Sequence, residues 1–153
     1  MTIADGFAIF ISVIALGFSL FQFYVERNRA RDEATINAFA ELQKEVLNNE
    51  AFVNADVAGI LENHKRIATG GIDVDWEKIS ECLARIEQFS VGVNTKVYNV
   101  SILDRMAGSH IVKEYNRFMP IIMYKRQKGN TNKRYIEFEK MAEKLKEENP
   151  DIN

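Results

Sequence analysis

Residues 5–31, DGFAIFISVIALGFSLFQFYVERNRAR, decide how this chain folds. Between Asp5 and Glu26 lie twenty residues without a charged side chain. As an α-helix this run is about 30 Å long, which matches the hydrocarbon core of a bilayer. A buried core helix is the alternative, but so long an uncharged run is rare inside a small domain. We therefore predict one transmembrane helix over residues 6–25, after a short extracytoplasmic N-terminus at residues 1–5.

Basic residues flank only one end of this run. The first five residues contain no Lys or Arg, whereas Arg27, Arg29 and Arg31 follow the run. A signal peptide would carry its basic residues at the N-terminal end, so that interpretation is set aside. Lys and Arg stay on the cytoplasmic side of a membrane. The N-terminus is therefore expected outside and residues 26–149 in the cytoplasm, followed by a C-terminal tail at residues 150–153.

Composition limits what the cytoplasmic part can be. The 153 residues have a formal net charge of −2, which by itself does not indicate nucleic-acid binding. Two prolines and eight glycines are few for a β-rich or disordered chain. The single cysteine, Cys82, cannot form an internal disulfide. Two histidines and one cysteine provide no set of zinc ligands, so no metal site and no cofactor are expected.

Apolar side chains recur every three or four residues along the cytoplasmic part, which is typical of packed helices. No Pro or Gly separates the span from residues 26–48, so the span should run on as one helix with apolar positions at Ile36, Phe39, Leu42 and Val46. A second helix is expected at residues 51–69, closed by Gly70-Gly71, and a third begins at a cap on Asp73 or Asp75. A fourth helix should run from about Ser101 to Pro120, with a break or bend at Gly108. The last helix should run from about Thr131 to Asn149-Pro150. The prediction is an all-α chain: one membrane helix and a cytoplasmic helical bundle.

Small and polar residues form a stripe along the predicted span. Starting at Asp5, they follow at steps of three and four residues: Ala8, Ser12, Ala15, Ser19, Gln22, Glu26 and Arg29. The opposite side carries Phe7, Phe10, Ile14, Phe18, Phe21 and Val25. One interpretation is a tight contact between two or three copies, since small residues drive helix association in lipid. The other is a ring of copies whose stripes line a water-filled pore. The spacing alone favours the contact, because packing seams are commoner than channels.

A second stretch, DRMAGSH at residues 104–110, places Arg105 and His110 at Arg-x4-His spacing. HEPN ribonucleases carry an Arg-x4–6-His motif on a helical bundle, where the basic residue stabilises phosphate charge and the His does acid–base chemistry. This copy has Met106 where a polar residue commonly follows the Arg. The alternative is structural: a salt bridge from Arg105 and a His110 that packs between helices.

The layout resembles the small transmembrane accessory protein of type VI-B CRISPR-Cas loci. The resemblance is carried by the span, by Arg105 and His110, and by SVGVN and NVSILDRMAGSH. It implies a HEPN-like bundle that assembles as an octameric ring in the bacterial inner membrane, works with an RNA-guided RNase and makes the membrane leaky during phage infection. Met106 departs from the motif, so RNase activity is not expected. Given this resemblance, we prefer the pore, lined by Ala8, Ser12, Ala15, Ser19, Gln22, Glu26 and Arg29.

Two weaker signals remain. KRQKGNTNKR, residues 125–134, holds five basic residues and could bind RNA or anionic lipid, although a solvated loop is the simpler interpretation. His64 lies near an apolar face, where a core or interface role is more common than metal binding. The alternative functions are a membrane-tethered HEPN-type RNase acting through Arg105 and His110, and an anchored interaction or signalling module.

Overall fold

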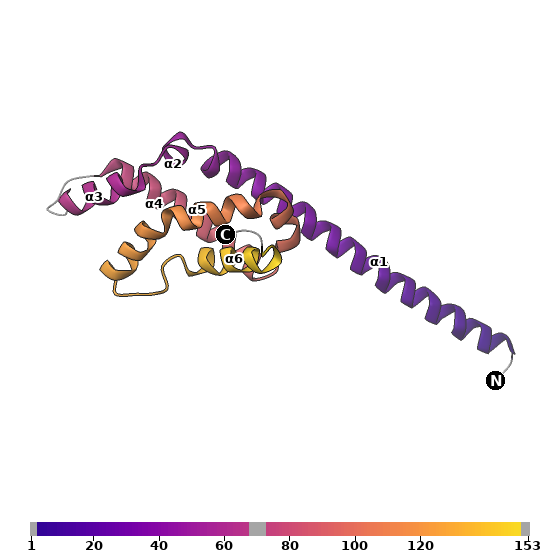
Figure 1. Ribbon diagram of the computed structural model, residues 1–153. Coiled ribbons are helices and arrows are strands. Elements are labelled where there is room, and N and C mark those ends of the chain that lie inside the picture. The colour runs from indigo at the N-terminus through magenta and orange to yellow at the C-terminus, as the bar shows by residue number, and fades with distance from the viewer. Residues whose placement is uncertain (1–2, 68–72, 151–153) are drawn as a thin grey trace.

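The chain folds as a helical bundle with one long protruding helix (Figure 1). A computed structural model describes residues 3–67 and 73–150, with side chains from residue 10 onward. Within these ranges there is no strand. The elements are α1 (Ile3–Leu42), a π-helical turn η1 (Gln43–Leu47), α2 (Glu50–Val53), α3 (Val57–Ile67), α4 (Val74–Asn94), α5 (Val100–Lys128) and α6 (Ile136–Glu148). The predicted all-α class is confirmed.

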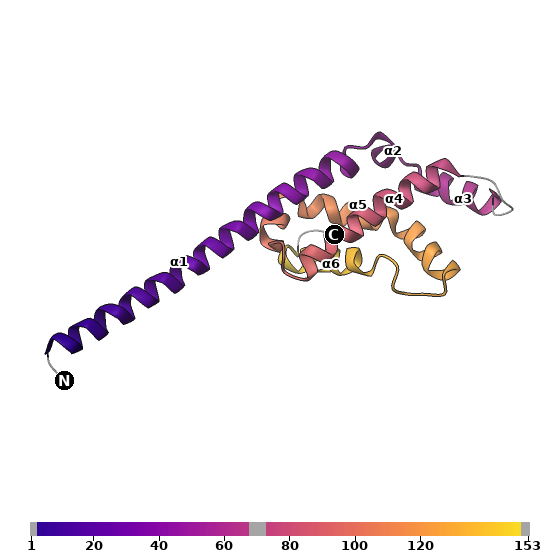
Figure 2. The ribbon, with the colours of Figure 1, turned by 180° about the vertical axis from the view of Figure 1, so that it is seen from behind.

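Helix α1 leaves the bundle and continues alone, as the two opposite views in Figures 1 and 2 show. Every side chain from Phe10 to Tyr24 is exposed, and Phe10, Phe18, Phe21 and Phe23 are each more than 60% exposed. The helix is long and apolar enough to cross a membrane. It passes without a break from the apolar segment into the bundle, as the absence of Pro and Gly after the span predicted.

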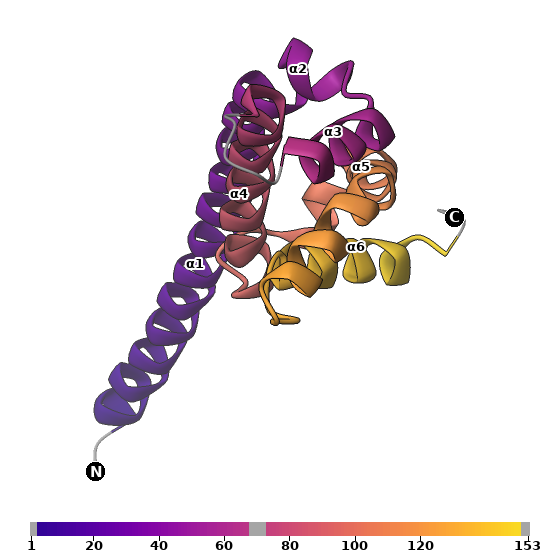
Figure 3. The same ribbon diagram turned by 90° about the vertical axis from the view of Figure 1, so that its left-hand side faces the viewer.

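The bundle encloses one core to which every element contributes. Helix α6 packs against both α4 and α5, and Figure 3 shows it crossing the bundle. Phe52 stacks on Phe118 with ring centroids 4.5 Å apart, and Tyr115 meets Phe138 edge to face at 5.2 Å. The largest fully buried side chains are Phe52, Phe118, Phe138, Ile79, Leu83, Leu103, Ile121, Ile122, Met141, Leu145, Val46 and Val112.

The single helix expected over residues 51–69 is wrong. Residues 54–56 break it into α2 and α3, so that Phe52 is buried in the core and α3 turns to a different face. Asp56 accepts a hydrogen bond from the Gly59 amide at 3.1 Å and so caps the start of α3. Across the break, Arg117 of α5 donates to the carbonyls of Phe52, Val53 and Ala55. The proposed stop at Gly70-Gly71 lies outside the described residues.

Pro120 does not end the fourth helix, because α5 continues to Lys128. A proline inside a helix costs about 3 kcal/mol. The residues around it, Phe118, Ile121 and Ile122, are all fully buried, and each buried side chain contributes about 1.5–3 kcal/mol. Core burial therefore outweighs the local penalty. The bend expected at Gly108 is found one residue earlier, where Ala107 has φ −157° and ψ 15°.

Helix α4 is capped by a residue next to it in sequence, and α6 by a residue of another helix. The predicted cap at Asp73 is confirmed: its carboxylate accepts from the Trp76 amide at 3.1 Å. Helix α6 starts at Ile136 rather than at Thr131, after Tyr135 in the left-handed region at φ 55°. Glu87 of α4 accepts hydrogen bonds from the Glu137 and Phe138 amides at 3.1 and 2.7 Å, so it caps α6 from across the bundle. The helix ends before Asn149-Pro150, as predicted.

Candidate functional site

The rest of the described chain leaves the outer face of α1 uncovered. On its bundle side α1 contributes half-buried or buried side chains at steps of three and four residues: Val25, Asn28, Asp32, Thr35, Phe39 and Leu42. The polar stripe runs one residue out of step with this line, through Glu26, Arg29 and Glu33. One residue turns an α-helix by about 100°. The stripe therefore faces to the side of the bundle and not into it.

The predicted pore-lining residues are exposed wherever their side chains are described. Ser12, Ala15, Ser19, Gln22, Glu26 and Arg29 are all exposed, whereas the side chains of Asp5 and Ala8 lie outside the described residues. Ile36, expected among the inward apolar positions, is 46% exposed and continues the stripe. Ala40 extends it by a further step. The uncovered face thus runs from the apolar segment along the side of the bundle.

The phenylalanine-rich side of the apolar segment meets the bundle-facing side of α1 near Val25. Ile11, Ile14, Phe18 and Phe21 continue, at the same three- and four-residue steps, the line that begins with Val25 and packs into the bundle. At any one level of α1 the polar stripe points about 100° away from this line. On a straight α-helix the line itself drifts by about 20° every seven residues, so the phenylalanine side of the apolar segment and the side that packs into the bundle coincide only near Val25.

A polar cluster fixes α1 to the bundle where the helix leaves it. The Asn99 amide donates to Thr35 Oγ1 at 2.8 Å, and Asn99 Nδ2 donates to Asp32 at 2.6 Å. Thr35 in turn donates to the Arg31 carbonyl at 2.7 Å. Thr35 is fully buried, so its hydroxyl is satisfied within the protein. This cluster joins the base of the span to the N-terminus of α5.

Arg105 and His110 do not form a site within one chain. Both side chains are exposed, and neither makes a hydrogen bond or an ion pair with any residue of the described ranges. The bend at Ala107 lies between them. The structural alternative, an Arg105 salt bridge and a packing His110, is therefore wrong for the protomer. Catalysis by this pair would need groups from another molecule.

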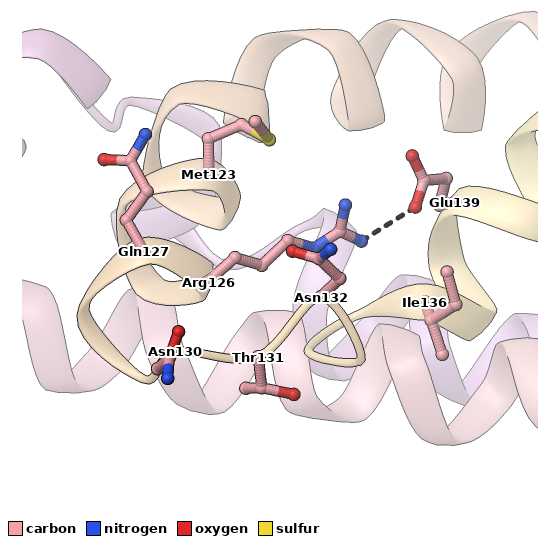
Figure 4. A pocket seen from close by; sticks show the side chains of 8 residues that line it. All are labelled: Met123, Arg126, Gln127, Asn130, Thr131, Asn132, Ile136 and Glu139. Carbon is pink, nitrogen blue, oxygen red and sulfur yellow. Dashed lines mark hydrogen bonds and ion pairs between the residues drawn. The ribbon is translucent and has the colours of Figure 1, made fainter.

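The basic run at residues 125–134 is not a free loop. Lys125 and Arg126 belong to α5 and are only 7% and 9% exposed. Arg126 donates to the Arg134 carbonyl and to Glu139, both at 2.8 Å, across a groove of about 680 Å³ (Figure 4). The hydrogen bond from Arg126 lowers the pKa of Glu139, and burial lowers the pKa of Lys125 to about 8. These two cations hold the α5–α6 turn, leaving Lys128, Lys133 and Arg134 exposed.

Sequence reasoning missed an aromatic cluster between α3, α4 and α5. The His64 ring stacks on Trp76 with centroids 3.7 Å apart, and Tyr124 lies edge-on to both rings. Lys125 Nζ lies 4.9 Å from the Trp76 ring centroid. Burial and the nearby Lys128 lower the pKa of His64. His64 is therefore an interface residue, as expected. Separately, residues 10–67 and 73–150 contain no cluster of acids, His or Cys that could hold a metal.

Comparison with known proteins defines the family of the chain. Residues 9–145 match the family described as a domain of unknown function, DUF4760. The chain belongs to this family. The match covers both the apolar part of α1 and the bundle as far as α6, so the two parts form one family unit. No curated protein and no solved structure matches the chain.

Proposed function

We propose that the protein is a homo-oligomeric membrane pore in which α1 crosses the membrane and its polar stripe lines the conduit. One observation carries the proposal: the stripe continues on the side of α1 that the protein's own bundle leaves uncovered. Ser19 and Gln22 have no water to meet in a bilayer, so a lone span would hold them against lipid. A second copy, or water inside a ring, resolves that cost.

The phase of α1 supports a ring over a closed pair. Because the bundle lies about 100° from the stripe at the level of Glu26 and Arg29, copies arranged around a central axis would place their bundles beside the conduit instead of across its mouth. Glu26 and Arg29 would surround the cytoplasmic mouth, and rings of charged side chains of this kind admit ions. An open path needs no further energy source, since one charge crossing 100 mV releases about 2.3 kcal/mol.

The biological setting of the proposal rests on the resemblance to type VI-B accessory proteins. It places the ring, an octamer, in the bacterial inner membrane with the N-terminus outside. Opening would depolarise the cell and enhance antiphage defence by an RNA-guided RNase. The HEPN-like bundle would act as the scaffold of the ring, because Arg105 and His110 have no described partner within the chain.

Dye leakage from vesicles tests the conduit directly. Ser19→Leu and Gln22→Leu should abolish leakage by the reconstituted protein, because they replace a polar lining with apolar side chains. The matched control is Phe18→Leu, which introduces the same side chain on the lipid side. Equal leakage from all three variants and the wild type would contradict the proposed lining.

Cysteine labelling locates the water. Cys82 is the only cysteine and is buried, and burial raises the pKa of its thiol, so it reacts slowly. Cysteines placed at Ser12, Ala15 and Ser19 should react with a charged thiol reagent in assembled protein, whereas cysteines at Ile14 and Phe21 should not. Particle mass in detergent gives the copy number. A monomer or dimer, or RNA cleavage that His110→Ala abolishes, would favour the tethered enzyme instead.

A further inference from the structure

A groove of about 390 Å³ lies at the base of the span, between α1, the α4–α5 turn and the end of α6. Figures 1 and 2 show from both sides that this turn lies beside α1 where the helix leaves the bundle. Three cations line the groove: Arg31 from α1, Lys96 from the turn and Lys144 from α6. Glu147 and Glu148, both exposed, also line it. It thus combines basic groups from parts of the chain that are far apart in sequence.

Within residues 10–67 and 73–150, no cation of this groove forms an ion pair, although Glu137 attracts Lys144 at longer range. Arg31 Nε is buried and has no hydrogen-bond partner. Lys96 and Lys144 form no ion pair in the described ranges, and neither glutamate pairs with them. A buried guanidinium N–H without an acceptor is costly, because it loses its hydrogen bonds to water without replacement. An oxygen-rich anion in the groove would satisfy it.

The N-terminus of α5 opens onto the same groove. Asn99, the N-cap, together with Val100 and Ser101, lines it. Asn99 Oδ1 accepts from the Ser101 amide at 3.1 Å, but other amides of the first turn have no partner inside the helix. The positive end of a long helix favours a phosphate at this position. The dipole of α5 and the cations therefore attract the same kind of ligand.

The depth of the groove matches lipid headgroups. Arg31 lies six residues beyond Val25, which is about 9 Å along the helix axis. The headgroup layer adds about 5–8 Å to each side of the hydrocarbon core, so the Arg31 backbone lies at or just beyond its outer edge. The Arg31 side chain can reach back into the layer, because helical side chains tilt toward the helix N-terminus. Val97, next to Lys96 in the turn, is 57% exposed. The Tyr98 amide donates to the Gly92 carbonyl at 3.0 Å and holds the turn in place.

We propose that this groove binds the phosphate of an anionic phospholipid headgroup on the cytoplasmic leaflet, held by Arg31, Lys96, Lys144 and the N-terminus of α5. The proposal rests on α1 crossing the membrane, but not on the pore. Its role is to set the depth and tilt of the bundle beneath the bilayer. The ligand is a membrane lipid because the groove opens beside the span, where headgroups are the most concentrated phosphates.

Amide hydrogen exchange on the full-length protein in nanodiscs tests the proposal. One sample uses neutral phosphatidylcholine and the other adds phosphatidylglycerol. The amides of residues 96–102 should exchange on the order of tenfold more slowly with the anionic lipid, because bound phosphate would hold the turn and the helix end closed. The triple variant Arg31→Gln, Lys96→Gln and Lys144→Gln should lose this protection. Lys96→Gln alone, at an exposed side chain, should lose part of it without a folding defect.

Two controls separate a site from general attraction to a charged surface. Lys44→Gln, Lys78→Gln and Lys133→Gln together remove the same charge at exposed positions remote from the groove and should retain the protection. Arg27→Gln with Arg29→Gln removes charge next to the span but outside the groove, and should also retain it. Equal exchange in both lipids, or equal loss in the groove and control variants, would overturn the proposal.

Further measurements identify the source of the phosphate and distinguish failure of this proposal from failure of the pore proposal. Protection by inorganic phosphate or by a short RNA in lipid-free detergent would overturn the lipid assignment. Amide exchange at residues 10–24 in the same samples reports whether α1 is inserted in the bilayer. Rapid exchange there would contradict the premise that α1 crosses the membrane. Vesicle leakage is measured separately, so loss of the pore with retained protection would leave this site standing.

Discussion

Replacing Arg117 with Met should open the break between α2 and α3. Arg117 Nη2 donates to the carbonyls of Phe52, Val53 and Ala55 at 2.9, 2.9 and 3.0 Å, and Nη1 contacts Glu114 at 3.0 Å. One nitrogen has two hydrogens, so two full hydrogen bonds operate at a time. Each bond from a charged donor is worth about 1.5–3 kcal/mol, and the side chain is 29% exposed, so water replaces part of them. We expect a loss of about 2–4 kcal/mol in the free energy of unfolding.

Urea unfolding in detergent, followed through the fluorescence of Trp76, the only tryptophan, measures this loss. Arg117→Lys keeps the charge but not the planar fork and should recover at most about half of it. Arg105→Met is the matched control, because Arg105 is exposed and without a described partner, and it should stay within about 0.5 kcal/mol of wild type. If Arg117→Met also stays within about 0.5 kcal/mol, the carbonyls of the break do not depend on Arg117.

Further measurements test the aromatic cluster and the turn below the span. Protonated His64 should quench Trp76, so fluorescence should fall with a midpoint below pH 6.5, and His64→Gln should abolish the step. Folding lowers the pKa of Lys125 to about 8, so above pH 8 the unfolded chain holds this proton and the folded chain does not. The free energy of unfolding should therefore rise with pH from about 8 to about 10, where tyrosines begin to ionise. Lys125→Met should flatten this rise. Gly92→Ala should cost about 1–3 kcal/mol in urea unfolding, since its Cβ would lie 2.3 Å from the Tyr98 ring; an unchanged midpoint would show that the ring moves away freely.

Local patterns predicted the elements and several of their ends. The length of the uncharged run predicted an apolar helix of membrane length, and the lack of Pro and Gly after it predicted its continuation. Asp73 caps α4 as its oxygen acceptor suggested, and Asn149-Pro150 follows the last helix. These features depend on residues within about one helical turn and on the surrounding solvent, so the sequence contains the information they need.

Predictions failed where a distant residue supplies the deciding contact. Asp56 offers a local cap for α3, but the donor that holds the carbonyls at the break is Arg117, more than sixty residues later. Lys125 is a second example of a residue whose partners are distant in sequence. The basic run predicts a solvated side chain, but Lys125 is buried and donates hydrogen bonds to Ser80 and Tyr135. A charge pattern alone cannot reveal such partners.

The candidate site divides in the same way. The sequence by itself determined that α1 has a polar stripe and an apolar side, since these follow from the 3.6-residue period of one helix. Only the tertiary structure decided that the stripe lies about 100° from the bundle, because the angle depends on how Thr35 and Asp32 meet Asn99. It alone brought Arg31, Lys96 and Lys144 into one groove, since three elements must pack before their charges can share a ligand.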